Sequence, residues 1–133
     1  MKSTGRYILV LLVLGIGQVR ADELVVIVNS AAAGMSKEQI ADVYLGRSND
    51  LTPIDQAASS PIYVEFYKKA TGRDLAQVKA IWSRIIFTGR GLPPKQMVDS
   101  AAVKKAVAAN PKAIGYIEKS AVDASIKVAL TLD

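Results

Sequence analysis

The hydrophobic positions of the chain change their spacing several times between residues 24 and 132. The first run, Leu24 to Val28, is continuous and rich in β-branched residues, which is typical of a strand covered on both faces. The last run, Ile126 to Leu132, alternates apolar with polar or small residues, as in a strand with one exposed face. Two further short apolar segments, 51–54 and 113–117, are also predicted to be strands.

Between these strands, apolar residues recur at spacings of three and four, which predicts four helices. Each begins at a polar residue that can cap its first turn, and two carry the Gln three positions later that completes a capping box. In the third helix Trp82 falls on the widest apolar stripe, so we expect it to be buried. The turn-rich segment 89–94 is expected to be a loop. The predicted helices lie between Ser36 and Gly46, Ser60 and Gly72, Asp74 and Gly89, and Ser100 and Asn110.

The order of these elements, β-α-β-α-α-α-β-β, predicts a single α/β domain with a small mixed β-sheet flanked by helices.

The N-terminal segment is not expected to belong to this domain. Lys2 and Arg6 precede an 11-residue apolar run, and a small-residue cleavage site ends at Ala21, so residues 1–21 are predicted to be a signal peptide and 22–133 the domain. A helix that spans a membrane needs about 20 apolar residues. We therefore expect a periplasmic protein without a permanent membrane anchor.

The composition excludes several kinds of chemistry. The chain has no Cys and no His, so it has no disulfide, no thiolate or imidazole metal site, and no Ser-His-Asp relay. Its carboxylates form no paired motif, and no nucleophile signature is present, so we expect a protein that is not an enzyme and uses no cofactor. Removal of residues 1–21 lowers the formal net charge from +5 to +2, which leaves no case for a nucleic-acid partner.

Five segments follow one another in an order seen in a known family. The most specific are Val43 to Arg47 (VYLGR) and Asn110 to Ile117 (NPKAIGYI), and the others are 25–29, 36–47 and 82–89. In these segments the chain resembles the phosphate-binding proteins of ABC transporters, a branch of the type 2 periplasmic-binding proteins. The resemblance covers nearly the whole predicted domain, but only the second lobe of a family whose ligand site lies between two closing lobes. It implies that fold, a small oxyanion ligand and a membrane transporter as partner.

The same resemblance indicates an anion site before the predicted second helix. In the family, an Arg precedes a Ser-Gly-Thr triplet at a helix start, where N–H groups, hydroxyls and the helix dipole bind an oxyanion. Here Ser59 matches the Ser of the triplet, Ser60 and Pro61 replace Gly and Thr, and Asp55 stands where the Arg is expected. A carboxylate opposes an anion, so Asp55→Arg is expected to strengthen phosphate binding. The candidate ligand-binding residues are Asp55, Gln56, Ser59 and Ser60.

These residues also have structural interpretations. The Ser59-Ser60 pair before Pro61 is typical of a plain helix cap, and Asp55 can accept hydrogen bonds from the N–H groups of the following turn. Three aromatic residues are interpreted as packing rather than as a platform for a sugar or a nucleobase. They are Tyr63, Tyr67 and Trp82.

Two hypotheses for the function follow. In the first, the protein is a small periplasmic solute-binding domain for an oxyanion or another small polar ligand, bound at the start of the predicted second helix. In the second, it keeps the lobe without the ligand and serves as an accessory or sensory domain that contacts a membrane receptor, transporter or kinase. The retained strand-to-helix architecture favours the first hypothesis, and the Asp55 and Pro61 replacements favour the second.

Overall fold

The computed structural model describes residues 23–133, and the predicted signal peptide, residues 1–21, lies outside the described residues. None of the helices within residues 23–133 is long and apolar enough to cross a membrane. The strands are β1 (Leu24–Asn29), β2 (Thr52–Gln56), β3 (Lys95–Met97), β4 (Ala113–Glu118) and β5 (Ile126–Leu132). The helices are α1 (Lys37–Tyr44), α2 (Pro61–Thr71), α3 (Leu75–Phe87) and α4 (Ser100–Ala109), with the short 3-10 helix η1 (Lys119–Ala121) before β5.

The five strands form one mixed sheet in the order β3-β2-β4-β1-β5. β2 runs parallel to both β3 and β4, whereas β1 is antiparallel to β4 and β5. β1 therefore lies inside the sheet, and its residues Leu24 to Val28 are all buried. This confirms the prediction of a first strand that is covered on both faces.

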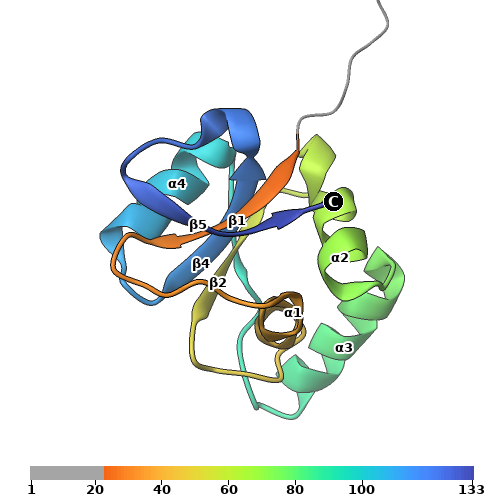
Figure 1. The fold of residues 1–133 in the computed structure, drawn as a ribbon. Coiled ribbons are helices and arrows are strands. Elements are labelled where there is room, and N and C mark those ends of the chain that lie inside the picture. The colour runs from red at the N-terminus through yellow and green to blue at the C-terminus, as the bar shows by residue number, and fades with distance from the viewer. Residues whose placement is uncertain (1–22) are drawn as a thin grey trace, which may run out of the picture.

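Helices cover both faces of the sheet (Figure 1). On one face, Tyr44 of α1 and Phe66 of α2 pack with Val26 of β1, and α3 packs against α2. On the other face lies α4, with Val103 packed in a second cluster with Ile27. The molecule thus has three layers, and the predicted α/β domain with a small mixed sheet flanked by helices is confirmed.

The helix starts follow the capping pattern of the sequence. Ser36 accepts a 3.1 Å hydrogen bond from the N–H of Gln39, whose side chain accepts one of 2.8 Å from the Ser36 N–H. Asp74 and Gln77 form the same reciprocal pair at the start of α3, at 2.9 and 3.0 Å. Both predicted capping boxes are therefore present. Each satisfies two N–H groups that a helix start leaves without a partner.

The structure contains one strand, β3, that was not predicted from the sequence. Its three residues pair in parallel with Ile54 to Gln56, so β2 also continues beyond its predicted end at residue 54. β3 is too short and too polar to show an alternating apolar pattern, and only backbone pairing with β2 defines it. The correction matters for the site because it places Asp55 and Gln56 inside the sheet rather than in a loop.

The packing of α3 also differs from the prediction. Trp82 is half-buried rather than buried, and Ile86 is 46% exposed. The reason is that α3 does not lie on the sheet. It packs through Val78 and Ile85 against α2 and the segment that follows α1, so only a narrow part of its apolar stripe is covered.

Candidate functional site

A crevice opens where β2 and β3 end, between the starts of α2 and α4. β2 leads into α2 on one face of the sheet, and the adjacent parallel strand β3 leads into α4 on the other face. Such a divergence leaves a depression at the carboxyl ends of the strands, which is a common ligand position in α/β proteins. We call this depression, of about 410 Å³, the serine crevice. Its lining residues are Gln56, Ser59, Ser60, Pro61, Val98, Asp99, Ser100, Ala101 and Glu118.

Gln56 forms the base of the serine crevice. Its side chain is buried, and its amide nitrogen donates to the Ser100 hydroxyl at 2.9 Å and to the Tyr116 carbonyl oxygen at 3.1 Å. Gln56 thus connects β2 with β4 and with the start of α4. With both amide protons engaged, its role in the structure is to shape the crevice.

The two predicted serines play different parts at the start of α2. The Ser60 hydroxyl accepts the N–H of Ile62 at 3.4 Å, and Pro61 is the first helical residue, so Ser60 is a helix cap. Ser59 is exposed, and its hydroxyl has no hydrogen-bond partner among residues 23–133. The first turn of α2 contains no acidic residue, so no carboxylate of the helix itself compensates its positive dipole end.

Two carboxylates line the same crevice. Asp99, rather than the predicted Ser100, caps α4 and accepts the N–H of Ala102 at 2.9 Å, while Ser100 donates to Glu118. No Lys or Arg lines the crevice, so its side-chain charge opposes an anion. In the described part of the chain no group of three or more carboxylates could bind a metal ion.

Asp55 does not share the serine crevice with Gln56, Ser59 and Ser60. Side chains alternate along a strand, so Asp55 faces the α2 side of the sheet while Gln56 faces α4. Its carboxylate is 4% exposed and accepts hydrogen bonds from the Tyr67 hydroxyl at 2.7 Å, from the Gln56 N–H at 3.0 Å and from the Tyr116 hydroxyl. Asp55 therefore lines a different depression from the one that Ser59 and Ser60 line.

The setting of Asp55 determines its ionisation. Burial raises the pKa of its carboxyl above the ordinary value of 3.8, and the hydrogen bonds from Tyr116, Tyr67 and the Gln56 N–H act in the opposite direction. Burial and the neighbouring Asp55 raise the pKa of both tyrosine hydroxyls, so these remain protonated donors. Sequence reasoning missed Tyr116 as a partner, because 61 residues separate it from Asp55 and no local pattern connects them.

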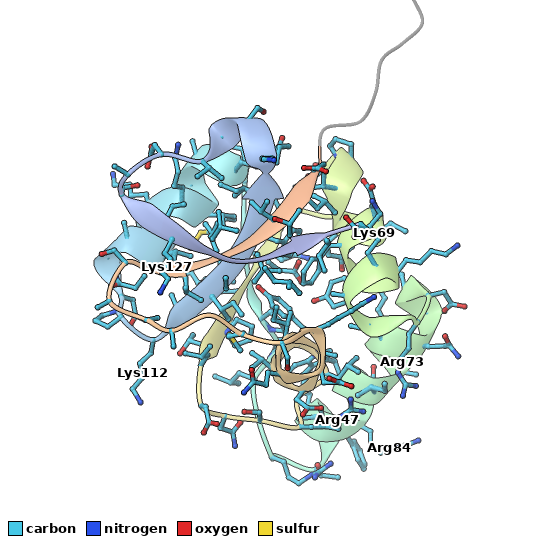
Figure 2. The ribbon with its side chains drawn as sticks, in the orientation of Figure 1. Arg47, Lys69, Arg73, Arg84, Lys112 and Lys127 are labelled. Atoms are coloured by element: carbon cyan, nitrogen blue, oxygen red, sulfur yellow. The ribbon has the colours of Figure 1, made fainter. Side chains whose placement is uncertain are left out.

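A second depression is basic. It has a volume of about 590 Å³ beside the end of α3, and Arg47, Arg84 and Arg90 line it. Figure 2 shows Arg47 and Arg84 close together at one edge of the molecule. Arg47 forms an ion pair of 2.9 Å with Asp42, whereas Arg84 has no acidic partner within residues 23–133. We call this the arginine depression; none of its arginines is among the ligand-binding residues predicted from the sequence.

Comparisons with known proteins bear on the fold. No protein-family model matches the chain, and no curated protein matches its sequence. An ABC-type phosphate transport receptor from Vibrio cholerae is similar in structure, with a TM-score of 0.63 and 20% identity over 80% of this chain and 45% of its own. A phosphate ABC transporter substrate-binding protein from Clostridium perfringens, solved with bound phosphate, has a TM-score of 0.65 and 19% identity over 81% of this chain and 44% of its own.

PstS from Borrelia burgdorferi is also similar, with a TM-score of 0.59 and 13% identity over 80% of this chain and 46% of its own. This chain therefore spans less than half the length of each of the three proteins. The resemblance predicted from the sequence is confirmed at the level of the fold, which is that of a single lobe of a phosphate ABC transporter substrate-binding protein.

Proposed function

We propose that this chain is a non-catalytic, periplasmic solute-binding domain, comprising residues 22–133 after removal of a signal peptide, that binds a small oxyanion in the serine crevice. The observation that carries the proposal is the position of the crevice. It lies at the carboxyl ends of β2 and β3, where α2 presents its N-terminus. A membrane transporter is the partner that this function implies.

The donors for an oxyanion come from the start of α2. Ser59 contributes an exposed hydroxyl, and the positive end of the α2 dipole adds attraction that no acid in the first turn cancels. Two solved proteins with this fold, those from Vibrio cholerae and Clostridium perfringens, are described as phosphate transport proteins, which favours the same ligand class here.

The carboxylates of the crevice limit the affinity for an anion. Asp99 and Glu118 face the same space as the Ser59 hydroxyl, and no basic side chain compensates for them. Binding by this lobe alone is therefore expected to be weak and to strengthen when either charge is removed. Glu118→Gln keeps an acceptor for the Ser100 hydroxyl, and Asp99→Asn keeps a good helix cap, so both variants remove charge with little change in structure.

Calorimetry and amide NMR with inorganic phosphate and sulfate test the proposal on protein expressed from the full chain. We expect saturable binding with shifts at Ser59 and Ser60, about tenfold weaker binding in Ser59→Ala, and tighter binding in Glu118→Gln. Ser83→Ala removes an exposed hydroxyl on α3 and serves as the matched control. Absence of binding in every variant, or shifts confined to the arginine depression, would contradict the proposal.

A second candidate is an accessory or sensory domain that contacts a membrane receptor, transporter or kinase without a small ligand. Phe87 and Leu92, at the end of α3 and in the loop that follows, are 92% and 84% exposed. Both belong to one segment of the chain, and exposed apolar side chains that form a contiguous patch mark surfaces that contact partners. The two carboxylates of the serine crevice favour this candidate as well.

Site-specific photo-crosslinking in the native envelope distinguishes the candidates. A crosslinking residue at Phe87 should capture one defined membrane protein if the domain is an accessory. The same residue at Val64, which is 53% exposed on α2, is the control and should not capture it. If neither position captures a partner while phosphate binds in the serine crevice, the solute-binding function stands alone.

A further inference from the structure

A third concave site lies on the α2 side of the sheet. Residues of α2, α3, the loop before β3, and the strands β2 and β3 line a depression of about 410 Å³, within the range of roughly 300–1,000 Å³ that is usual for small-molecule pockets. It shares no lining residue with the serine crevice. The residues that matter for its chemistry are Asp55, Tyr63, Tyr67, Lys79, Trp82 and Gln96, and we call it the aromatic pocket.

The polar atoms of two of its three aromatic rings already have partners. The Trp82 indole N–H donates to the Tyr44 carbonyl oxygen at 2.8 Å, and the Tyr67 hydroxyl donates to Asp55 at 2.7 Å. These two rings are thereby fixed in orientation. What they present to the pocket is ring surface, which suits an apolar group or a cation.

Asp55 supplies a charge at the base of the pocket. An ionised carboxylate offers about four acceptor positions, and protein donors occupy three of them. No Lys or Arg of the described part forms an ion pair with this carboxylate, although it is 4% exposed. A buried carboxylate without a cation is unfavourable, and a cationic group beside it lowers that cost.

We propose that the aromatic pocket binds a small organic cation, a singly charged ammonium group on an apolar body, with the charge toward Asp55 and the body among the rings of Tyr63, Tyr67 and Trp82. Ring faces attract a cation through their quadrupole, and the carboxylate adds a charge-assisted hydrogen bond. An oxyanion does not fit, because Asp55 repels it. The proposal goes beyond the proposed function and does not depend on it.

Lys79 is the other charged residue of the pocket. It is exposed on α3, so water weakens its repulsion of a bound cation without removing it. Reversal of this charge is nevertheless expected to strengthen cation binding. Because the side chain is exposed, the substitution carries little risk for folding.

Trp82 provides a direct readout, since it is the one Trp of the chain and lies in the pocket wall. Protein expressed from the full chain is titrated with 2-phenylethylammonium, neutral 2-phenylethanol and anionic 3-phenylpropanoate, and Trp fluorescence is recorded. We expect a saturable change with the ammonium probe, about tenfold weaker binding of the alcohol, and no binding of the acid.

Two substitutions locate the charge that recognises the probe. Asp55→Asn should weaken binding of the ammonium probe about tenfold while leaving the alcohol unchanged. Asp50→Asn makes the same exchange at an exposed position before β2 and should have no effect. Circular dichroism checks that the Asp55 variant is folded.

If Asp55→Asn does not fold, Lys79→Glu tests the proposal instead. It should tighten binding of the ammonium probe several-fold, whereas Lys105→Glu, an equal change of net charge at an exposed position on α4, should not. Equal affinity for the three probes, no saturable change with the ammonium probe, or indifference of its binding to Lys79→Glu would overturn the proposal.

Discussion

The indole nitrogen of Trp82 donates a 2.8 Å hydrogen bond to the carbonyl oxygen of Tyr44, the last residue of α1. The Tyr44 hydroxyl in turn lies 2.8 Å from the carbonyl oxygen of Ile54 on β2 and 3.1 Å from that of Ile114 on β4. A series of hydrogen bonds therefore runs from α3 through α1 to the middle of the sheet. These hydrogen bonds hold the Trp82 ring in place. The ring attaches α3 to α1 and also forms a wall of the aromatic pocket.

This relationship predicts the effect of changes at Trp82. A fully buried Trp would cost ~3–5 kcal/mol on replacement by Ala, but the ring is half-buried, so we expect Trp82→Ala to lower the free energy of unfolding by ~2–3 kcal/mol. Trp82→Phe keeps most of the ring and should cost ~1 kcal/mol, the contribution of the hydrogen bond to Tyr44. Urea unfolding measures both values. Equal stability of the wild type and the Ala variant would contradict this attachment of α3.

A second prediction concerns Gly46, which lies where the turn that follows α1 closely contacts α3. Gly46 has a φ of 76°, and a Cβ at this position would overlap the Ile85 side chain and lie 3.3 Å from the Trp82 ring. Gly46→Ala should therefore destabilise the protein by ~2–4 kcal/mol, from the left-handed backbone and from the overlap together. Thermal unfolding provides the measurement.

Gly72 is the matched control for Gly46. Its φ of 72° is nearly the same, but a Cβ there would meet no atom within 4 Å. Gly72→Ala should therefore lose only the backbone contribution, ~1 kcal/mol. Equal losses in the two variants would show that the turn at Gly46 does not pack closely against α3.

The sequence predicted those parts of the fold that local patterns determine. The continuous run Leu24 to Val28 is buried on both faces, and the capping boxes at Ser36 and Asp74 are present, because each depends on residues no more than four positions apart. β3 was missed because only pairing with β2 defines it. The burial of Trp82 was overestimated because periodicity indicates which side of α3 faces inward but not what lies opposite.

The sequence also predicted only that part of the candidate site which local patterns determine. Ser60 is the cap that Ser-Pro indicates, and Gln56, Ser59 and Ser60 do lie in one crevice. Asp55 lies outside this crevice because its orientation depends on the extension of β2 by two residues. Whether the serine crevice and the aromatic pocket bind the proposed ligands stays a prediction.

The position of Asp55 reverses the expectation for Asp55→Arg. Beside the serine pair this change would strengthen phosphate binding, but in the core it buries a guanidinium group and removes the acceptor of Tyr67 and Tyr116. We expect a loss of ~3–5 kcal/mol in the free energy of unfolding and no gain in phosphate binding. Asp50→Arg, the same exchange at an exposed position, should stay within about 0.5 kcal/mol of the wild type. A stable Asp55→Arg protein that binds phosphate would contradict this placement.

The raised pKa of Asp55 predicts how stability depends on pH. Burial holds the pKa of this carboxyl in the folded state above its ordinary value of 3.8, so the folded protein retains a proton that the unfolded chain has already lost. The contribution of Asp55 to the free energy of unfolding is therefore highest below pH 3.8. It falls as the pH rises through the folded-state pKa, and it is constant above that pKa. Asp55→Asn cannot ionise and removes this dependence.

Urea unfolding of the wild type and of Asp55→Asn between pH 3 and pH 7 isolates the effect. Asp123, whose pKa is lowered to about 2 by hydrogen bonds from Ser125 and Lys104, contributes with the opposite sign, because its stabilisation is lost as the pH falls. It is present in both proteins, so it cancels in the difference between them. The stability of the wild type relative to the variant should fall as the pH rises from 4. A difference that stays constant or increases over this range would contradict a raised pKa for the Asp55 carboxyl, because it would mean that the tyrosine hydrogen bonds balance or outweigh the effect of burial.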